Sequence, residues 1–108
     1  MEGKPILWLV SLSFDAPERE EEFNKWYSEV HVPQMVEIPG VLSGTRYAAI
    51  RTQPGQLKYL TIYELESEEA IDSIQASPEM EEARQDFRAR WAPYVGERTH
   101  AWYERIAP

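Results

Sequence analysis

The sequence predicts an α+β fold in which strands and helices follow one another in the order βαββαβ. Four segments have strand character, and amphipathic helical segments follow the first and the third of them. A short polar turn separates the two middle strands, as in a hairpin. At 108 residues the chain has the length of one domain, so residues 1–108 are expected to form a single unit.

The first strand is predicted at residues 5–14, which are rich in Ile, Leu, Trp and Val without strict alternation. That composition is typical of a strand covered on both faces. Asp15 is the expected N-cap of the first helix, because Pro17 and Glu18 follow it at first-turn positions. An apolar stripe at helical spacing then predicts the buried face of this helix: Phe23, Trp26, Tyr27 and Val30.

The first helix is expected to end or distort near Val32, because Pro33 disfavours helical geometry in the residue before it. Residues 31–40 are predicted to be a connector that closes with the Pro39-Gly40 turn. Strands are predicted at 41–50 and 57–65, joined by a polar turn at 52–56.

Alternation within the third strand assigns its side chains to two faces. Leu60 and Ile62 point one way, and a semi-polar, aromatic set points the other: Tyr59, Thr61, Tyr63 and Leu65.

The second helical region has two start signals, Ser67 with two glutamates after it and Ser77 followed by Pro78. Gly96 is expected to close it. Its apolar positions recur at helical spacing: Met80, Ala83, Phe87, Trp91 and Tyr94. A last strand is predicted at 97–106, with alternating faces formed by Thr99, Ala101 and Tyr103 on one side and by His100, Trp102 and Ile106 on the other.

These elements predict a ferredoxin-like, four-stranded antiparallel sheet with both helices on one face, because the crossovers are right-handed. The opposite face is then bare. We expect it to carry aromatic side chains such as Tyr59 and Tyr63. An exposed patch of this kind is usually covered by another chain, so a homodimer that packs sheet against sheet is expected.

Composition disfavours several classes of partner and site. A formal net charge of -8 repels nucleic acid and anionic membrane surfaces. The absence of cysteine removes thiol nucleophiles, disulfides and thiolate metal sites. The apolar run near the N-terminus, about eight residues long, is too short for a signal or membrane segment, and a cytoplasmic protein is expected.

One segment resembles a known family pattern. Residues 23–33 read FNKWYSEVHVP, and Ile38-Pro39-Gly40-Val41 and then Arg46-Tyr47 follow. This resembles the EthD-like branch of the dimeric α+β barrel superfamily, in which a helix ending in Trp/Tyr leads to His-x-Pro and then to Pro-Gly-hydrophobic. Residues 59–64 (YLTIYE), which lead into Ser67-Glu68-Glu69-Ala70, extend the similarity.

The resemblance implies a homodimer whose sheets form a barrel, with a pocket in each subunit between its sheet and its helices or loops. Relatives in that superfamily include cofactor-free isomerases, polyketide cyclases, small quinone-forming monooxygenases and haem-handling enzymes. The fold therefore does not select a reaction.

His31 is the first candidate for chemistry. It follows Tyr27 by four residues and Phe23 by eight, so on a continued helix it lies on the apolar stripe. An imidazole exchanges protons near neutral pH, which suits a general acid or base. The alternative is a structural histidine that hydrogen-bonds the last carbonyls of the helix.

Arg46 and Tyr47 are neighbours on one strand, so only one of them can face a given pocket. Arg46 can orient a carboxylate or enolate, or it can be a paired barrel or interface residue. Tyr63, beside Tyr59, can donate to a developing oxyanion or can belong to the interface.

Two further pairs of residues have open roles. His100 and Trp102 share one face of the last strand, where His100 can serve haem ligation or a proton relay, or lie exposed at an edge. Trp26 and Trp91 belong to helical stripes and can pack the core or wall a pocket. The histidine spacing does not fit a metal site, and neither a glycine-rich nucleotide motif nor a nucleophile elbow is present.

The sequence thus favours a cofactor-independent isomerase, cyclase or lyase that acts on a hydrophobic aromatic or polyketide-like carbonyl compound. His31 transfers the proton, and Arg46 or Tyr63 steadies the enolate oxygen. The substrate-binding candidates are Trp26, Tyr27, Tyr47, Trp91, His100 and Trp102, with no metal. Two alternatives stay open: a cofactor-free monooxygenase or haem-binding relative, and a non-catalytic ligand-binding dimer.

Overall fold

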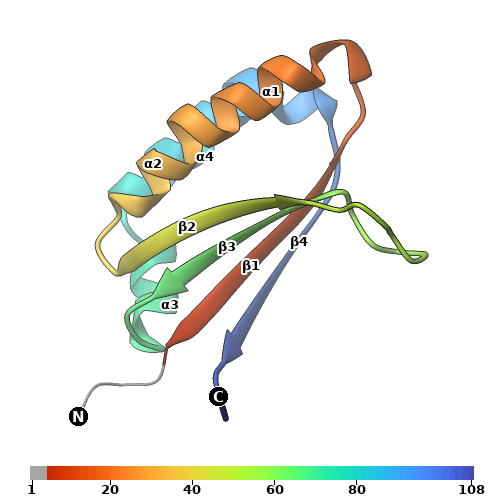
Figure 1. Cartoon of the computed structure of the whole chain (residues 1–108). Coiled ribbons are helices and arrows are strands. Elements are labelled where there is room, and N and C mark those ends of the chain that lie inside the picture. Colours follow the sequence, from red (N-terminus) through yellow and green to blue (C-terminus); the bar gives the residue numbers. More distant parts are fainter. Residues whose placement is uncertain (1–4) are drawn as a thin grey trace.

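The computed structural model describes residues 5–108 and contains a four-stranded sheet with helices on one face (Figure 1). The prediction that residues 1–108 form one domain includes residues 1–4, which lie outside the described residues. The strands are β1 (Ile6–Phe14), β2 (Val41–Ala48), β3 (Tyr59–Leu65) and β4 (Val95–Glu104). The helices are α1 (Glu20–Trp26), α2 (Val32–Val36), α3 (Glu69–Gln75) and α4 (Pro78–Trp91), with 3₁₀ turns at Pro17–Arg19 and Ala92–Tyr94 and a π-helical turn at Tyr27–His31.

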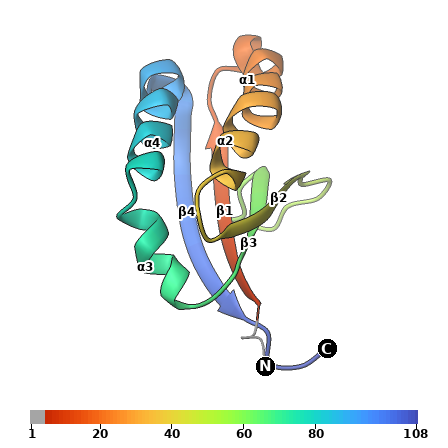
Figure 2. The ribbon, with the colours of Figure 1, turned by 90° about the vertical axis from the view of Figure 1, so that its left-hand side faces the viewer.

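The sheet has the order β2-β3-β1-β4, and every neighbouring pair is antiparallel. Figure 2 looks onto the helical layer, where α1 and α2 form one column and α3 and α4 form another, in front of the sheet. The predicted ferredoxin-like βαββαβ arrangement, with its helices on one face, is therefore confirmed. Strand ends differ from the predicted ranges by no more than two residues, which is the usual uncertainty at element boundaries.

The core lies between the sheet and the helical layer. Pairing register places Trp8 opposite both Tyr63 and Trp102, and places Val10 opposite Thr61 and His100. Residues opposite each other in antiparallel strands point to the same side, so these rows face the helices. The largest fully buried side chains come from both layers: Trp8, Trp91, Tyr63, Phe23, Leu12, Met35, Ile38, Leu65 and Ile74.

The expected composition of the bare sheet face is wrong. Tyr59 and Tyr63 are buried under the helices, with only 7% and 1% of their surface exposed. Large rings gain more from the deeply buried face, and the Tyr59 hydroxyl finds polar partners there in Glu20 and Asn24.

The bare face carries instead the other set of alternating side chains. A row made by Thr45, Ile62, Leu9 and Ala101 crosses all four strands. Leu7, Tyr47 and Tyr103 are the large exposed apolar residues of this face, and we call these seven residues the open sheet face.

The first helix distorts just before Val32, as predicted, but it does not end there, which corrects the predicted connector at residues 31–40. It widens into the π-helical turn, where the Val32 N–H donates to the carbonyl of Tyr27, and continues as α2. Pro33 has no N–H to donate, and the π-helical turn just before it is a distortion that lets the helix continue past this residue. The connector between α2 and β2 is therefore residues 37–40, shorter than the predicted connector at 31–40.

The π-helical turn also changes which side chains face inward. Val30 was expected on the apolar stripe but is 47% exposed, whereas His31 is 8% exposed. One additional residue in the turn rotates the following side chains, because a π turn closes over five residues and not four. His31 keeps the inward position that its spacing to Tyr27 predicts.

Two expected caps are also wrong. Asp15 does not cap the first helix: the 3₁₀ turn begins after Ala16, with no side-chain cap, and the Asp15 N–H donates to the Tyr94 carbonyl. Gly96 does not close a helix but lies within β4, where a β-carbon would come 2.6 Å from Ser13 Oγ. Only glycine permits this close approach of β4 to the end of β1.

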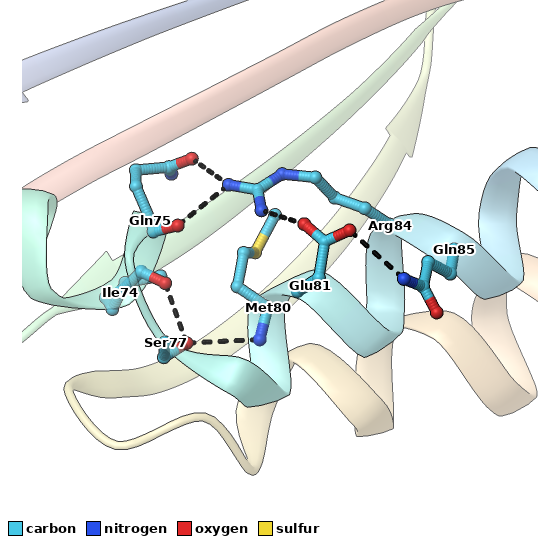
Figure 3. A network of polar contacts seen from close by, with 7 residues as sticks. All are labelled: Ile74, Gln75, Ser77, Met80, Glu81, Arg84 and Gln85. Atoms are coloured by element: carbon cyan, nitrogen blue, oxygen red, sulfur yellow. Dashed lines mark hydrogen bonds and ion pairs between the residues drawn. The ribbon is translucent and has the colours of Figure 1, made fainter.

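Other local predictions are confirmed. Gly40 has a φ of 101°, and the turn before β2 is closed by the Val41 N–H, which donates to the Ile38 carbonyl at 3.0 Å. Ser77 caps α4 by accepting a hydrogen bond from the Met80 N–H at 3.1 Å (Figure 3). No helix among residues 5–108 is long and apolar enough to cross a membrane.

Candidate active site

A narrow cavity of about 40 Å³ lies between the sheet and the helical layer, room for a few water molecules. Its walls come from the π-helical turn, α2, α4 and the helix-facing sides of β1, β3 and β4. They combine aromatic and apolar side chains with two histidines and three arginines: Trp8, Val10, Tyr27, His31, Met35, Tyr63, Met80, Arg84, Phe87, Arg88, Arg98 and His100.

His31 lines this cavity from the π-helical turn. Its ring stacks on Trp26 at 5.4 Å between centroids and meets the edge of Tyr27 at 4.7 Å. Phe87 of α4 lies 5.4 Å away on the opposite helical column. The buried Nδ1 atom has no hydrogen-bond partner among residues 5–108. A buried, unpaired ring nitrogen is costly, which makes it a candidate for ligand contact or proton transfer.

Burial, with a smaller effect of Arg98 and Arg46, lowers the pKa of His31 to about 4. The imidazole is therefore neutral at pH 7 and has a lone pair available to accept a proton.

Tyr63 reaches the same cavity from β3. Its hydroxyl is buried and has no hydrogen-bond partner among residues 5–108. Burial and the neighbouring Tyr27 hydroxyl raise the pKa of Tyr63 well above its usual value, so the phenol keeps its proton. Gly44 on β2 makes room for this ring, since a β-carbon there would lie 2.9 Å from it.

His100 lines the cavity from β4 and is fixed by Trp8. The Trp8 indole N–H donates to His100 Nδ1 at 3.1 Å. The imidazole and two indoles form a cluster, with ring centroids 5.8 Å apart for His100 and Trp8, 6.1 Å for His100 and Trp102, and 6.0 Å for the two indoles. Burial, then Arg98 and Arg84, lower the pKa of His100. The structure thus brings both histidines of the chain to one cavity.

Arg46 faces the helices but lies outside the cavity lining. Its guanidinium packs over the Tyr27 ring at 4.3 Å and donates to Asn24 Oδ1 and Ser28 Oγ, each at 3.0 Å. These contacts join β2 to the first helix. Arg46 therefore supports the wall that Tyr27 forms, and contacts the cavity only through that ring.

The other aromatic candidates are divided among three places. Trp26 backs His31, and Trp102 backs His100, so each contacts a histidine without lining the cavity. Trp91 is 2% exposed and packs against Phe14 and other core rings. Tyr47 is on the open sheet face, on the other side of the sheet from His31.

The sequence analysis missed several cavity residues. The sequence analysis interpreted Trp8 only as part of a covered strand, because no signal in the sequence indicates that Trp8 would meet His100. Arg98 shares the alternating face of β4 with His100 and Trp102, which was a usable signal. Arg84 and Arg88 are four residues apart on α4, a spacing that places two like charges side by side.

The arrangement suits proton transfer in a site with little water. A neutral imidazole can accept a proton, a protonated phenol can donate a hydrogen bond, and aromatic walls exclude solvent. Among residues 5–108, no three His, Asp or Glu side chains lie close enough together to hold a metal ion.

The sheet order, the helical layer on one face and the cavity between them define a protein of the ferredoxin-like α+β class. The chain belongs to the family described as Domain of unknown function (DUF4286), whose model matches residues 6–105. No curated protein matches the sequence.

Three solved structures illustrate the likeness of fold. An EthD family protein from Bacillus halodurans is 16% identical, with a TM-score of 0.69 over 94% of this chain and 99% of that one. A dimeric ferredoxin-like protein of unknown function from Thermobifida fusca is 17% identical, with a TM-score of 0.65 over 95% and 92%. SnoaB, a cofactor-independent oxygenase from Streptomyces nogalater, is 13% identical, with a TM-score of 0.68 over 98% and 97%.

Identities this low show a shared fold and nothing finer. At that level they confirm the ferredoxin-like fold that the resemblance to the EthD-like branch implies.

Proposed function

We propose that this protein is a small cofactor-independent enzyme that moves a proton on a hydrophobic aromatic or polyketide-like carbonyl compound. One observation carries the proposal: a buried, neutral imidazole whose Nδ1 has no hydrogen-bond partner among residues 5–108 lines an aromatic cavity together with a buried phenol. Titratable groups with strongly shifted pKa values that share a cavity are typical of acid–base sites.

In the proposed reaction His31 accepts a proton from a carbon next to the carbonyl. The C–H electron pair forms a C=C bond with the carbonyl carbon, the π pair of the carbonyl moves onto its oxygen, and the Tyr63 hydroxyl donates a hydrogen bond to the enolate that forms. Return of the proton to a different carbon completes an isomerisation, whereas loss of a leaving group or attack on a second carbonyl completes an elimination or a cyclisation. Arg46 holds Tyr27 in place and is a positioning residue in this scheme.

The pKa of His31, about 4, indicates the kind of substrate. A weak base works best on an acidic C–H, such as one between a carbonyl and an aromatic ring. Stacking on Trp26 and the aromatic walls suit a flat ring in the same place.

A cofactor-free oxygenase is the second candidate, because the fold matches SnoaB over nearly the whole of both chains. It shares the first step: the anion that His31 creates would reduce O₂. One oxygen atom then enters the substrate as a ketone and the other leaves as water. The haem alternative has less support at His100, since Trp8 donates to Nδ1 and the neutral ring then carries its proton on Nε2, the nitrogen that would bind iron.

We also propose a homodimer formed by the open sheet face. Leu7, Tyr47 and Tyr103 are 37%, 51% and 57% exposed there, an apolar surface that a second copy would cover. The Thermobifida fusca protein of this fold is described as dimeric.

The test follows deuterium exchange at the acidic carbon of 2-tetralone in D₂O by NMR. We expect the wild type to accelerate exchange and His31→Gln to lose about a hundredfold or more of that acceleration, the usual contribution of a general base. Tyr63→Phe should lose about tenfold, and Tyr47→Phe, the same change on the open sheet face, should lose nothing.

Full exchange activity in His31→Gln would refute the assignment of His31 as the base. Binding of 2-tetralone to the wild type without exchange would indicate a non-catalytic module. Oxygen consumption in the presence of anthrone, measured with an oxygen electrode, distinguishes the oxygenase from the isomerase or cyclase. An oxygenase consumes one O₂ for each anthrone oxidised, whereas an isomerase or cyclase turns over equally well without oxygen.

A further inference from the structure

The charged side chains that line the cavity are three arginines, Arg84, Arg88 and Arg98, and no Asp or Glu of residues 5–108 lines it. The nearest carboxylate to act on His31 is that of Asp86, which lies outside the lining and slightly opposes the fall of the His31 pKa. The chain as a whole has the opposite bias, with 19 acidic residues against 11 Lys and Arg. Because Arg84 and Arg88 are also like charges four residues apart on α4, their placement costs some helix stability. A bound anion would offset that cost.

The three arginines differ in how they are held. Arg84 donates to Glu81 at 3.1 Å and to the Gln75 carbonyl at 3.0 Å, so its charge is partly neutralised and its position fixed (Figure 3). Arg88 and Arg98 form no ion pair with any residue of 5–108. Arg98 packs its guanidinium over the Phe87 ring at 5.0 Å. Two arginines at the cavity thus have no internal anion to bind.

His100 adds a donor to the same wall. An indole N–H can only donate, so the Trp8 contact requires a bare lone pair on His100 Nδ1. The neutral ring must then carry its proton on Nε2. Arg98 shares the helix-facing side of β4 with His100, since the two are two positions apart along the strand.

We propose that the ligand of this cavity carries a carboxylate, which Arg88 and Arg98 bind at the cavity entrance while its apolar ring lies among the aromatic walls. A planar guanidinium pairs with a carboxylate through two parallel hydrogen bonds, which selects this anion over a diffuse negative charge. His100 donates through Nε2–H on the same side. The inference rests on the proposed function only in assigning the cavity as the substrate site.

The experiment compares 4-hydroxybenzoate with its uncharged analogue 4-hydroxybenzamide, titrated into ¹⁵N-labelled protein. The Trp8 indole N–H signal reports binding inside the cavity. In the wild type we expect saturable shifts and an affinity about tenfold higher for the carboxylate, as for a charge-assisted hydrogen-bonded pair. Arg88→Gln and Arg98→Gln should each reduce that preference, and the double variant should abolish it.

Arg90→Gln is the matched control, because it removes the same charge from the same helix at a residue that does not line the cavity. It should keep the preference for the carboxylate. Equal affinity for the two compounds, no shift at Trp8, or an Arg90→Gln effect as large as that of Arg98→Gln would each overturn the proposal.

Separate measurements of proton exchange and of carboxylate binding on the wild type distinguish this inference from the proposed function. Carboxylate binding without any proton exchange in the wild type would refute the proposed function alone. Exchange of 2-tetralone with no carboxylate preference would refute the anion site alone.

Discussion

At the scale of single residues, the geometry around His31 explains why its charge state matters for stability. Aromatic rings surround the imidazole, and no carboxylate among residues 5–108 pairs with it. Adding a proton would create a buried cation with Arg98 nearby, which is why the pKa falls to about 4. The same environment keeps the ring neutral, as a proton acceptor requires.

The first prediction concerns pH and stability. The unfolded chain binds a proton at His31 near pH 6.5, whereas the folded chain does so only near pH 4. Between these values the unfolded state holds more protons, so stability falls as the pH falls. From pH 7.5 to pH 5 the His31 contribution to the free energy of unfolding should drop by about 2 kcal/mol.

Urea denaturation at both pH values, at one protein concentration, measures this loss in the wild type. The free energy of unfolding of His31→Gln should fall by about 2 kcal/mol less than that of the wild type, because glutamine does not titrate. Identical pH dependence in the two proteins would mean that His31 titrates normally.

At the scale of secondary-structure elements, the π-helical turn decides which residue reaches the cavity. The apolar stripe of the first helix placed both Val30 and His31 inward, and in the widened turn Val30 is exposed while His31 stays buried. The His31-x-Pro33 sequence was correctly interpreted as a disturbance of the helix. Its form, a π turn and not a helix end, follows from packing of α2 against β2 and α4, which local sequence does not contain.

The second element-scale feature is α4, which presents Arg84, Phe87 and Arg88 to the cavity. Its N-cap is Ser77, whose hydroxyl accepts from the Met80 N–H. Ser77→Ala should lower the free energy of unfolding by about 1 kcal/mol, the usual cost of losing such a cap. Ser73→Ala, inside α3, should have a much smaller effect because alanine favours the helix interior. Chemical denaturation of both variants measures the difference, and equal losses would contradict the capping role.

At the scale of the whole molecule, the fold leaves one side of the sheet uncovered. The open sheet face places Leu9 and Ile62 side by side at its centre, where both are half-buried within one chain. Apolar residues in the middle of an uncovered sheet indicate a second layer, and another copy of the chain supplies it in the proposed dimer.

Ile62→Lys should therefore convert a dimer into a monomer, because a lysine at the centre of the open sheet face would bury an unpaired charge in the interface. Val30→Lys is the control, since it makes a similar change at an exposed position on the helical layer. Size-exclusion chromatography with light scattering should give twice the chain mass of 12.6 kDa for the wild type and Val30→Lys, and 12.6 kDa for Ile62→Lys. A wild type of 12.6 kDa at micromolar concentration would refute the dimer.

Sequence alone determined the order of elements, because each depends on local signals. Strand-like runs, the Ser77-Pro78 start and the Pro39-Gly40 turn all appeared where expected. The inward placement of His31 was likewise readable from its spacing to Tyr27. These features depend on the backbone preferences of a few neighbouring residues and on helical periodicity.

Tertiary structure decided which face of the sheet the helices cover and which side chains share the cavity. β3 carries apolar residues on both sides, so alternation could not tell whether Tyr63 or Ile62 would be buried. The meeting of His31 with Tyr63, His100 and Arg98 joins residues from a helix and two strands far apart in sequence. Such contacts follow from strand register and layer packing, which are properties of the whole chain and which no local pattern encodes.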